Sequence, residues 1–378
     1  MARGELTTHL DCEDFVRGCE FFGTGGGGPA RDGLGRLIEA LDEGIPLRWV
    51  DPSEIPDDAW TCTVFGMGSA APRDDATDPV VEALGLTMRL GYAAMETAVT
   101  EYAAFTGKAI DVIVVSELGG GATPGALVAA MRLGMICVDG DYSGRAVPEL
   151  MQGTPYLRSK GDEALTSVDT WGDVVIVKHA TNSLMLERIG KWLSIAARSR
   201  CYQATTLLSG VEMRDLVIPG TLTRCHALGR VMREARERSQ DPIAAVIGEV
   251  DGYLLFEGTV VSKEWEDRDG YLYGTTTVSG VDRFAGHTLR IWFMNENHIT
   301  WLDGEPWVTS PDLVVVADRQ TGEAYLNASI DAGCEISVVG IRGWEAFRSE
   351  RGLSCAGPRH FGYDFDYRPI EELLDQHQ

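Results

Sequence analysis

Three short apolar runs in the first part of the chain are each followed by glycines and by side chains that can exchange a proton or bind a ligand. Ser69 follows the first run, Glu117 the second, and Asp139 and Asp141 lie at the end of the third. If the runs are neighbouring strands, these side chains meet beyond the carboxyl ends of the strands, where open α/β sheets bind their ligands. The pattern predicts a site for acid–base chemistry on a small molecule.

Glu117 has the best position for proton transfer. It comes shortly after an apolar run at residues 112–115, so its carboxyl is expected at the mouth of the sheet, partly removed from water. Partial desolvation raises the pKa of a carboxyl and suits it to general acid–base catalysis. Glu149 lies in the segment after the third run, and the predicted catalytic residues are therefore Glu117, Asp139, Asp141 and Glu149.

Asp139 and Asp141 flank a glycine, and Arg145 follows them closely. Two carboxylates two residues apart on a loop can chelate a hard cation or hold a water molecule, while an arginine can bind a substrate carboxylate through two parallel hydrogen bonds. The alternative is structural: the aspartates cap the next segment, and Arg145 pairs with Glu149 four residues later. Placement at a strand end favours the functional interpretation.

Two glycine-rich loops are candidates for contact with a substrate. Residues 119–121 lead into a helix that begins at Thr123-Pro124, so their amides and the positive helix end could bind an anion or oxyanion, although a plain turn is the alternative. Residues 23–28 join two helical patterns, and from local sequence a helix cap with a linker is favoured over a loop that covers the site. Neither loop has the pattern of a nucleotide-binding loop or dinucleotide fingerprint. The predicted substrate contacts are Gly25, Gly26, Ser69, Gly119, Gly120, Gly121 and Arg145.

Histidines and cysteines give no standard metal or nucleophile motif. Neighbouring positions on a helix point about 100° apart, so Cys225-His226 is interpreted as a buried cysteine beside an unrelated histidine. His179 follows an apolar run, and His360 lies in a dense cluster of glycine, proline and aromatic residues. The metal ligands therefore stay unknown: His179, His360 and Asp139 are candidates for a divalent ion such as zinc, and no cofactor is assigned.

Repeated alternation of strand and helix patterns up to about residue 160 predicts a mostly parallel sheet covered by helices, which is an α/β fold. A helical pattern runs from Leu84 to Tyr102. Strand signals separated by Asp-Gly and Thr-Gly turns dominate later, with two helices at 183–198 and 223–238. We expect an α/β domain at residues 1–164, a β-rich domain at 165–345, and a tail at 346–378 that packs back on the first domain.

Composition narrows the class of protein. The chain has 378 residues, a formal net charge of −24 and 44% hydrophobic residues, which fits a globular protein and disfavours nucleic acid and anionic membranes as partners. Its eight cysteines form no CxxC pair, and no run approaches about 18 apolar residues. We expect a cytoplasmic protein with a small-molecule substrate, and a homo-oligomer because this is the commonest assembly.

Three of these motifs together resemble the S-methyl thiohydantoin desulfurase family: GTGGGG at 23–28, SELGGG at 116–121, and the acidic segment at 139–149. The likeness continues through residues 219–222, 311–313 and 357–363, so it covers nearly the whole chain. It implies an α/β domain followed by a β-rich domain. It also implies hydrolysis of an S-methylated thiohydantoin with a propionate arm to a hydantoin and methanethiol, within bacterial breakdown of ergothioneine-type thiols.

Under this resemblance the candidate residues take specific roles. Glu117 is the expected general base, Asp139 and Asp141 orient water or a divalent metal, Arg145 holds the propionate, and the amides of residues 119–121 meet the ring carbonyl. A metal-hydroxide mechanism is one alternative. Others are a hydrolase acting on hydantoin- or oxoproline-like rings with hydantoinase-type partner subunits, and a non-catalytic module that binds a small molecule or regulates an enzyme.

Overall fold

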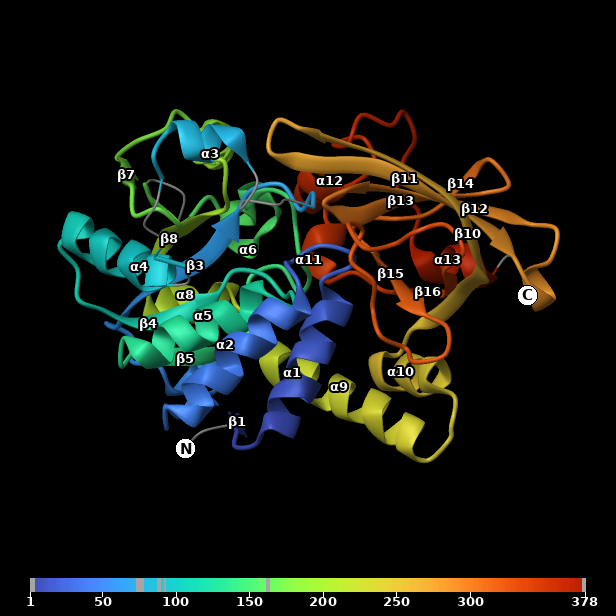
Figure 1. The fold of residues 1–378 in the computed structure, drawn as a ribbon, viewed down its shortest axis with the longest axis horizontal. Coiled ribbons are helices and arrows are strands. Elements are labelled where there is room, and N and C mark those ends of the chain that lie inside the picture. The colour runs from blue at the N-terminus through green and yellow to red at the C-terminus, as the bar shows by residue number, and fades with distance from the viewer. Residues whose placement is uncertain (1–3, 73–77, 87–89, 92, 161–163, 376–378) are drawn as a thin grey trace.

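A computed structural model describes residues 4–72, 78–86, 90–91, 93–160 and 164–375. Two seven-stranded sheets dominate it, one formed by strands between residues 60 and 219 and one by strands between residues 253 and 341. Helices α1 (His9–Phe22) and α9 (Thr221–Glu237) lie below and between them (Figure 1). A further pair joins β1 (Gly4–Leu6) to β2 (Leu47–Trp49). No helix in the described ranges is both long and apolar enough to cross a membrane.

The first sheet confirms the predicted α/β fold, but its strands are mixed in direction. Only the central strands β3, β4 and β5 are parallel, and all the other pairs are antiparallel, so the prediction of a mostly parallel sheet is wrong in this respect. The outer strands come from later in the chain, where the sequence shows hairpin-like patterns. In spatial order the strands are β7 (Val174–Val177), β6 (Leu165–Asp169), β8 (Cys201–Ser209), β3 (Trp60–Met67), β4 (Ile110–Val115), β5 (Ile136–Asp141) and β9 (Ile218–Pro219).

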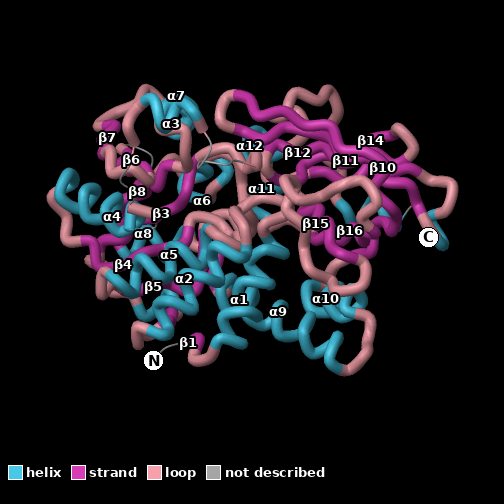
Figure 2. Tube along the Cα trace, in the orientation of Figure 1, coloured by secondary structure: helices cyan, strands magenta, loops and turns pink. Residues whose placement is uncertain are grey.

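Helices cover both faces of this sheet (Figure 2). Strand β4 shows why: Ile113 and Val115 belong to one hydrophobic core, while Val112 and Val114 face another on the opposite side. The first core is shared with α2 (Ala30–Asp42), α4 (Ala93–Thr106) and α5 (Ala122–Arg132), and the second with α8 (Gly210–Leu216). The central strands are therefore buried on both faces of the sheet.

The helix predicted from Leu84 to Tyr102 is shorter than expected. Helix α3 spans Pro79–Ala83, with Leu84 at its C-cap, and α4 begins at Ala93. Positions 87–89 and 92 of the predicted helix lie outside the described residues.

The second sheet is entirely antiparallel and confirms the β-rich second half. Asp269-Gly270 and Asp303-Gly304 form hairpin turns as predicted, whereas Asp251 ends a helix in a left-handed conformation with φ 52°. In spatial order the strands are β14 (Glu305–Thr309), β13 (Glu296–Leu302), β12 (Thr288–Met294), β11 (Tyr271–Gly280), β10 (Tyr253–Arg268), β16 (Glu335–Ile341) and β15 (Leu313–Asp318).

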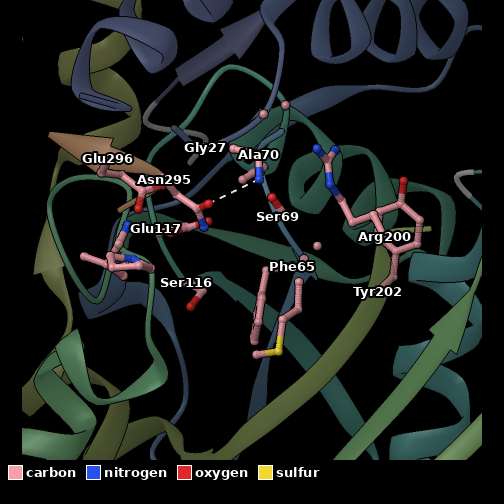
Figure 3. A pocket seen from close by; sticks show the side chains of 18 of the residues that line it. Gly27, Phe65, Ser69, Ala70, Ser116, Glu117, Arg200, Tyr202, Asn295 and Glu296 are labelled. Atoms are coloured by element: carbon pink, nitrogen blue, oxygen red, sulfur yellow. Dashed lines mark hydrogen bonds between the residues drawn. The ribbon is translucent and has the colours of Figure 1, made fainter. Parts of the chain in front are cut away.

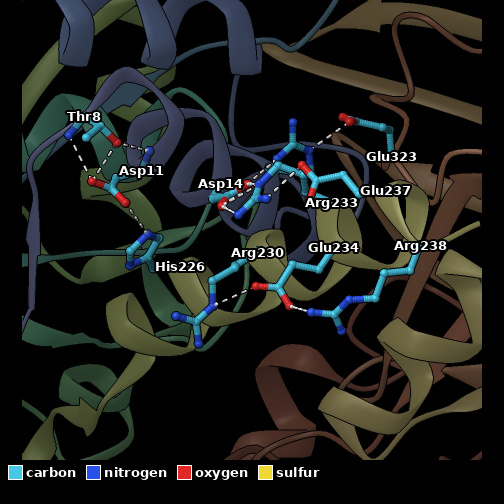
Figure 4. Close-up of polar contacts among 11 residues, drawn as sticks. Thr8, Asp11, Asp14, His226, Arg230, Arg233, Glu234, Glu237, Arg238 and Glu323 are labelled. Carbon is cyan, nitrogen blue, oxygen red and sulfur yellow. Dashed lines mark hydrogen bonds and ion pairs between the residues drawn. The ribbon is translucent and has the colours of Figure 1, made fainter. Parts of the chain in front are cut away.

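The predicted helices at 183–198 and 223–238 are present as α7 (Ser183–Ala196) and α9. Helix α9 packs along α1, and α10 (Pro242–Val250) follows it towards the second sheet (Figure 1). Cys225 is buried on α9, whereas Nε2 of His226 lies 3.7 Å from Oδ1 of Asp11 at the start of α1 (Figure 4). The two side chains therefore have separate surroundings, as their adjacency on a helix predicts.

The last residues contact both halves of the molecule. Helices α6 (Thr154–Leu157), α11 (Glu345–Arg348) and α12 (Glu350–Ala356) lie together, and Gln152 donates a hydrogen bond to the carbonyl of Cys355. Ile370 in α13 (Ile370–Asp375) is buried in the core of the second sheet. The tail thus links the loops of the first sheet to the second.

Candidate functional site

A pocket opens at the carboxyl ends of β3 and β4, with about 890 Å³ of space, part of it continuous with solvent. Four of the predicted site residues line it: Ser69, Glu117, Gly121 and Glu149. Helix α7 supplies another wall. Strand β8, through Tyr202, and the turn between β12 and β13, through Asn295 and Glu296, supply further walls (Figure 3). The site is therefore built by both halves of the chain.

Glu117 stands at the end of β4 with one oxygen held by the protein. Its Oε2 accepts a hydrogen bond of 2.8 Å from the backbone amide of Val147. Burial raises its pKa to about 7, although the Val147 amide and the positive charge of Lys191 oppose that rise. The rise in pKa has the direction that the position of Glu117 after the strand predicts.

Glu296, which the sequence analysis missed, is the second carboxyl in the pocket. It is the first residue of β13, only 3% of it is exposed, and its Oε2 has no hydrogen-bond partner among the described residues. Burial, followed by the negative charge of Glu117, raises its pKa to about 8. A Cβ atom on Gly26 would lie 1.9 Å from its Oε1, so the glycine loop leaves room for this carboxyl.

Helix α7 adds a lysine and a third glutamate. Lys191 Nζ lies 3.7 Å from Glu187 Oε1, 3.4 Å from the carbonyl oxygen of Gly68 and 4.1 Å from the centre of the Tyr271 ring. Glu187 also accepts hydrogen bonds from the Leu150 amide and the Tyr271 hydroxyl. Unlike Glu296, Glu187 is thus held in place by protein groups.

Arg200 lies on the side of the pocket opposite to Glu117 and Glu296 in Figure 3. The stem of its side chain covers Gly66, where a Cβ atom would lie 2.5 Å from Arg200 Cδ. Its guanidinium has no hydrogen bond or ion pair with any residue that the structure describes. A cation is therefore free to bind an anionic part of a ligand at this end of the pocket.

Glu149 connects the pocket to the C-terminal segment. Its Oε2 and Nε2 of His360 form a hydrogen bond, and the pair is mostly buried. The ring of His360 lies against Phe361, which in turn stacks on His298 of β13. His360 is thus positioned as a partner of Glu149.

The glycine loops position one another more than they contact the pocket. The Gly119 amide donates to Thr123 Oγ1, and the Gly121 amide donates to the carbonyls of the loop at residues 23–28. A Cβ atom on Gly119 would lie 2.4 Å from the Cα of Gly27, so the loops touch through their backbones. Gly27, Gly28 and Gly121 line the pocket, whereas Gly25, Gly26, Gly119 and Gly120 lie outside its lining.

Asp139 and Asp141 also lie outside the pocket lining. Both oxygens of Asp139 accept hydrogen bonds from Thr223, at 3.0 Å from its amide and 2.6 Å from its hydroxyl, which anchors the first turn of α9. Asp141 Oδ2 accepts hydrogen bonds from the amides of Ser143 and Gly144. The contacts of Asp141 are those of the structural alternative, in which it caps the following segment, whereas Asp139 holds the start of a helix distant in sequence.

Arg145 is buried away from the pocket lining and makes no ion pair with Glu149. Its Nη2 donates hydrogen bonds of 2.8 Å to Thr24 Oγ1 and 2.9 Å to the Asn297 carbonyl. Burial lowers its pKa to about 10, although the charges of nearby carboxyls oppose this change. Arg145 therefore joins the glycine loop to the second sheet, behind the candidate site.

The three candidate metal ligands are not brought together. His179 is exposed after β7, His360 binds Glu149, and Asp139 binds Thr223. Over the described ranges, no group of three or more histidine, cysteine, aspartate or glutamate side chains is arranged to hold a metal ion. These residues therefore do not fit a zinc site.

Family models match nearly the whole chain. The S-Me-THD-like N-terminal domain matches residues 10–179, and the S-Me-THD-like C-terminal domain matches residues 181–370. The chain belongs to the S-Me-THD-like family. This confirms the resemblance found from the glycine and acidic motifs. A comparison with curated proteins finds no significant match.

The S-Me-THD-like fold also occurs in a crystal structure of a protein from Chromobacterium violaceum. That protein is 20% identical to this chain, and the match covers 97% of this chain and 100% of the other, with a TM-score of 0.76. At this identity the similarity establishes the fold alone.

Sequence reasoning overlooked Glu296, Lys191 and Arg200 in this S-Me-THD-like protein. One signal was present for Glu296: it lies in Asn295-Glu296-Asn297-His298, four polar residues directly after the apolar run of β12. Such a polar group between two strand patterns is typical of a turn, and all four side chains are buried in the structure. Lys191 and Arg200 had no comparable local signal, because their contacts depend on how α7 and β8 pack against β3.

Proposed function

We propose that this chain is a hydrolase that cleaves the C–S bond of an S-methylated thiohydantoin and releases methanethiol and a hydantoin. The family supports the substrate class. The observation that carries the proposed chemistry is the pair of Glu117 and Glu296, brought from different sheets to one pocket, each with a raised pKa. Two coupled carboxyls that ionise in separate steps supply both a base and an acid near neutral pH.

The substrate carbon lies between two ring nitrogens and carries the methylthio group. Glu117 removes a proton from water as the water oxygen bonds to this carbon, and Glu296 gives its proton to the ring nitrogen that takes up the displaced electron pair. The C–S bond then breaks as the carbonyl forms. Glu117 returns its proton to the leaving sulfur, and Glu296 recovers a proton from the carbon-bound hydroxyl, so both groups regain their starting states.

Arg200 takes the place that the sequence analysis gave to Arg145. Arg145 is occupied behind the site, whereas the guanidinium of Arg200 lines the pocket on the side away from the two glutamates. We assign it to the carboxylate of the propionate arm. Lys191 lies near Gly68 and Glu187. Its positive charge opposes the rise in the pKa of Glu117 and so favours the ionised form of that carboxyl. Asp139 and Asp141 are positioning residues in this proposal.

The test is thiol release from S-methyl thiohydantoin propionate by the purified full chain. The assay is run before and after exhaustive chelation, with divalent metal added back, and beside the Glu117→Gln variant. We expect release that survives metal removal and is lost in Glu117→Gln. Glu335→Gln, at an exposed position at the start of β16, is the matched control and keeps full activity.

Three results would contradict parts of the proposal. Release that disappears with chelation and returns with metal would move the chemistry from the glutamate pair to a metal site. Full activity in Glu117→Gln would remove its role as the base. No release by the wild-type chain would exclude this substrate, and ring opening of an unmodified hydantoin would then be measured.

A further inference from the structure

A second, small cavity, with room for a group about the size of one water molecule or a monatomic ion, lies behind the candidate site. Val147 lines both cavities, so the segment that donates a hydrogen bond to Glu117 is the wall between them. Side chains from three parts of the fold enclose this second cavity: Arg145 and Gln152 from the loops after β5, His298 and Ser310 from β13 and the end of β14, and Trp344 before α11.

Several polar atoms around this cavity are buried without a hydrogen-bond partner in the part of the chain that the structure describes. Nη1 of Arg145 and Oε1 of Gln152 have no hydrogen bond to any described residue. The ring nitrogens of His298 have no well-formed hydrogen bond among the described residues, although the backbone of Met294 is close enough to act on the ring. All three residues are at least nine-tenths buried. A buried polar group without a partner is costly, so a cluster of them around one cavity points to an occupant.

The charge of Arg145 is the strongest part of this cluster. Its other hydrogen bonds go to uncharged oxygens of Thr24, Ala146 and Asn297, and no described carboxylate is within ion-pair distance. Glu296, Asp312 and Glu117 act on it electrostatically from beyond ion-pair distance. Hydrogen bonds from the Gly343 and Ile370 amides and the Tyr367 hydroxyl already occupy the Asp312 carboxyl. The guanidinium is therefore buried without direct neutralisation.

The groups around the cavity are mostly donors. Arg145 Nη1 is a cationic donor, and a neutral His298 offers one ring N–H. The Ser310 hydroxyl and the Trp344 indole N–H are further donors among the lining residues. Burial and the positive charge of Arg145 hold the pKa of His298 well below its usual value, so its ring is neutral. Gln152 Oε1 is the acceptor in the set, and Pro311 and Phe347 limit the remaining space.

We propose that this second cavity is a binding site for a small monovalent anion, held by Arg145 and the ring N–H of His298. Halide and formate share the required charge and small size, and bromide is the probe used below. Because Arg145 also acts electrostatically on Glu117 and Glu296, an anion at this place would partly cancel its field in the neighbouring candidate site.

The first test is crystallographic. The full chain is crystallised in sodium bromide and in sodium acetate, and anomalous scattering is measured at the bromine edge. We expect an anomalous peak within hydrogen-bond distance of Arg145 Nη1 and the His298 ring. Ordered water alone at that place in bromide would overturn the proposal.

The second test measures binding in solution through thermal unfolding in bromide and in gluconate at equal ionic strength. A ligand that binds only the folded state raises Tm, and near-saturating bromide is expected to raise it by roughly 2–4 °C. His298→Phe removes the ring donor and fills part of the cavity, so this rise should be lost. His287→Phe is the matched control, because His287 is an exposed histidine at a turn of the second sheet.

Arg145→Gln is avoided as the main variant because Arg145 also holds Thr24 and Asn297. If His298→Phe fails to fold, Ser310→Val tests the same loss of response from another wall of the cavity. A crystallographic peak with equal bromide shifts in all variants would mean binding at crystal concentration only, and would overturn a solution site.

Discussion

Buried carboxylates occur in two very different settings in this molecule. Asp14 on α1 is 2% exposed and is surrounded by the guanidinium groups of Arg17 and Arg233, with N–O distances of 2.7–3.1 Å (Figure 4). Glu296 is 3% exposed, yet its carboxyl is beside another carboxyl and one oxygen has no described partner (Figure 3). Protein groups neutralise the charge of Asp14, whereas the carboxyl of Glu296 is left to interact with a ligand.

The difference shows which carboxylates stabilise the fold. Asp14 and Glu323 join α1, α9 and the loop after β15 through Arg17, Arg233 and Arg236. Such a connected network supports the contact between the two halves of the chain. The Glu117–Glu296 pair places like groups together in a pocket, which disfavours the charged state of both. Functional sites often accept this kind of destabilisation.

The largest expected effect comes from removing acid–base function in the pocket. Glu117→Gln and Glu296→Gln should each lower kcat by roughly 10²–10⁴-fold, because general acid–base catalysis contributes on that scale. Thiol release and circular dichroism are measured for both variants beside Glu335→Gln. Unchanged kcat in Glu296→Gln would remove it from the proposed mechanism and leave Glu117 with a different acid.

Substitutions in the ion-pair network of Asp14 and Glu323 should lower the stability of the fold and leave catalysis unchanged. Asp14→Asn leaves two arginines without their shared carboxylate and should lower the free energy of unfolding by about 3 kcal/mol, the scale found when one partner of a buried ion pair is removed. Denaturant unfolding measures this change, and the folded fraction should keep its kcat. Glu237→Gln, which changes an exposed partner of the same Arg233, should cost at most about 0.5 kcal/mol. Equal effects of both substitutions would show that the network does not depend on burial.

The helices and strands that depend on local sequence patterns could be predicted from the sequence. The strand before Glu117, the helix on each side of the first glycine run and the antiparallel second half follow from periodicity and turn residues. Partners distant in sequence were not predictable in this way. Glu296 meets Glu117 only because the turn between β12 and β13 packs over the first sheet, and Arg145 turns inward because Thr24 and Asn297 offer it acceptors.

A smaller effect is expected on the side of the pocket opposite to the glutamates. Arg200→Gln removes the guanidinium, which has no partner among the described residues. It should raise KM for a substrate with a carboxylate arm by roughly 10–100-fold, with little change in kcat, because a charge-assisted hydrogen bond contributes about 1.5–3 kcal/mol. Arg198→Gln is the control, since the nearby Arg198 pairs with Asp78 outside the pocket. A substrate that lacks the carboxylate should show the same KM in wild type and Arg200→Gln, and an equal rise for both substrates would contradict a role in binding the arm.

The smallest effect is a pH dependence of stability that distinguishes the pocket pair from the network. The folded-state pKa values of Glu117 and Glu296 are raised to about 7 and about 8, whereas an unfolded glutamate titrates near 4.5, so between these values the folded chain binds more protons than the unfolded chain. The contribution of the pair is therefore fully present below about pH 4.5 and is lost as the pH rises through 8, with a slope of at most about 1.4 kcal/mol per pH unit for each group. Hydrogen bonds from Arg236 and Arg17 keep the pKa of Glu323 below its usual value, although burial opposes this. Glu323 therefore stabilises the folded chain when it is ionised, and this contribution is lost as the pH falls.

Denaturant unfolding from pH 5 to pH 8 should show that the free energy of unfolding declines less steeply in Glu296→Gln than in wild type or Glu335→Gln. Parallel curves for all three proteins would mean that Glu296 titrates normally in the folded chain, and the distinction between the two settings would then rest on geometry alone.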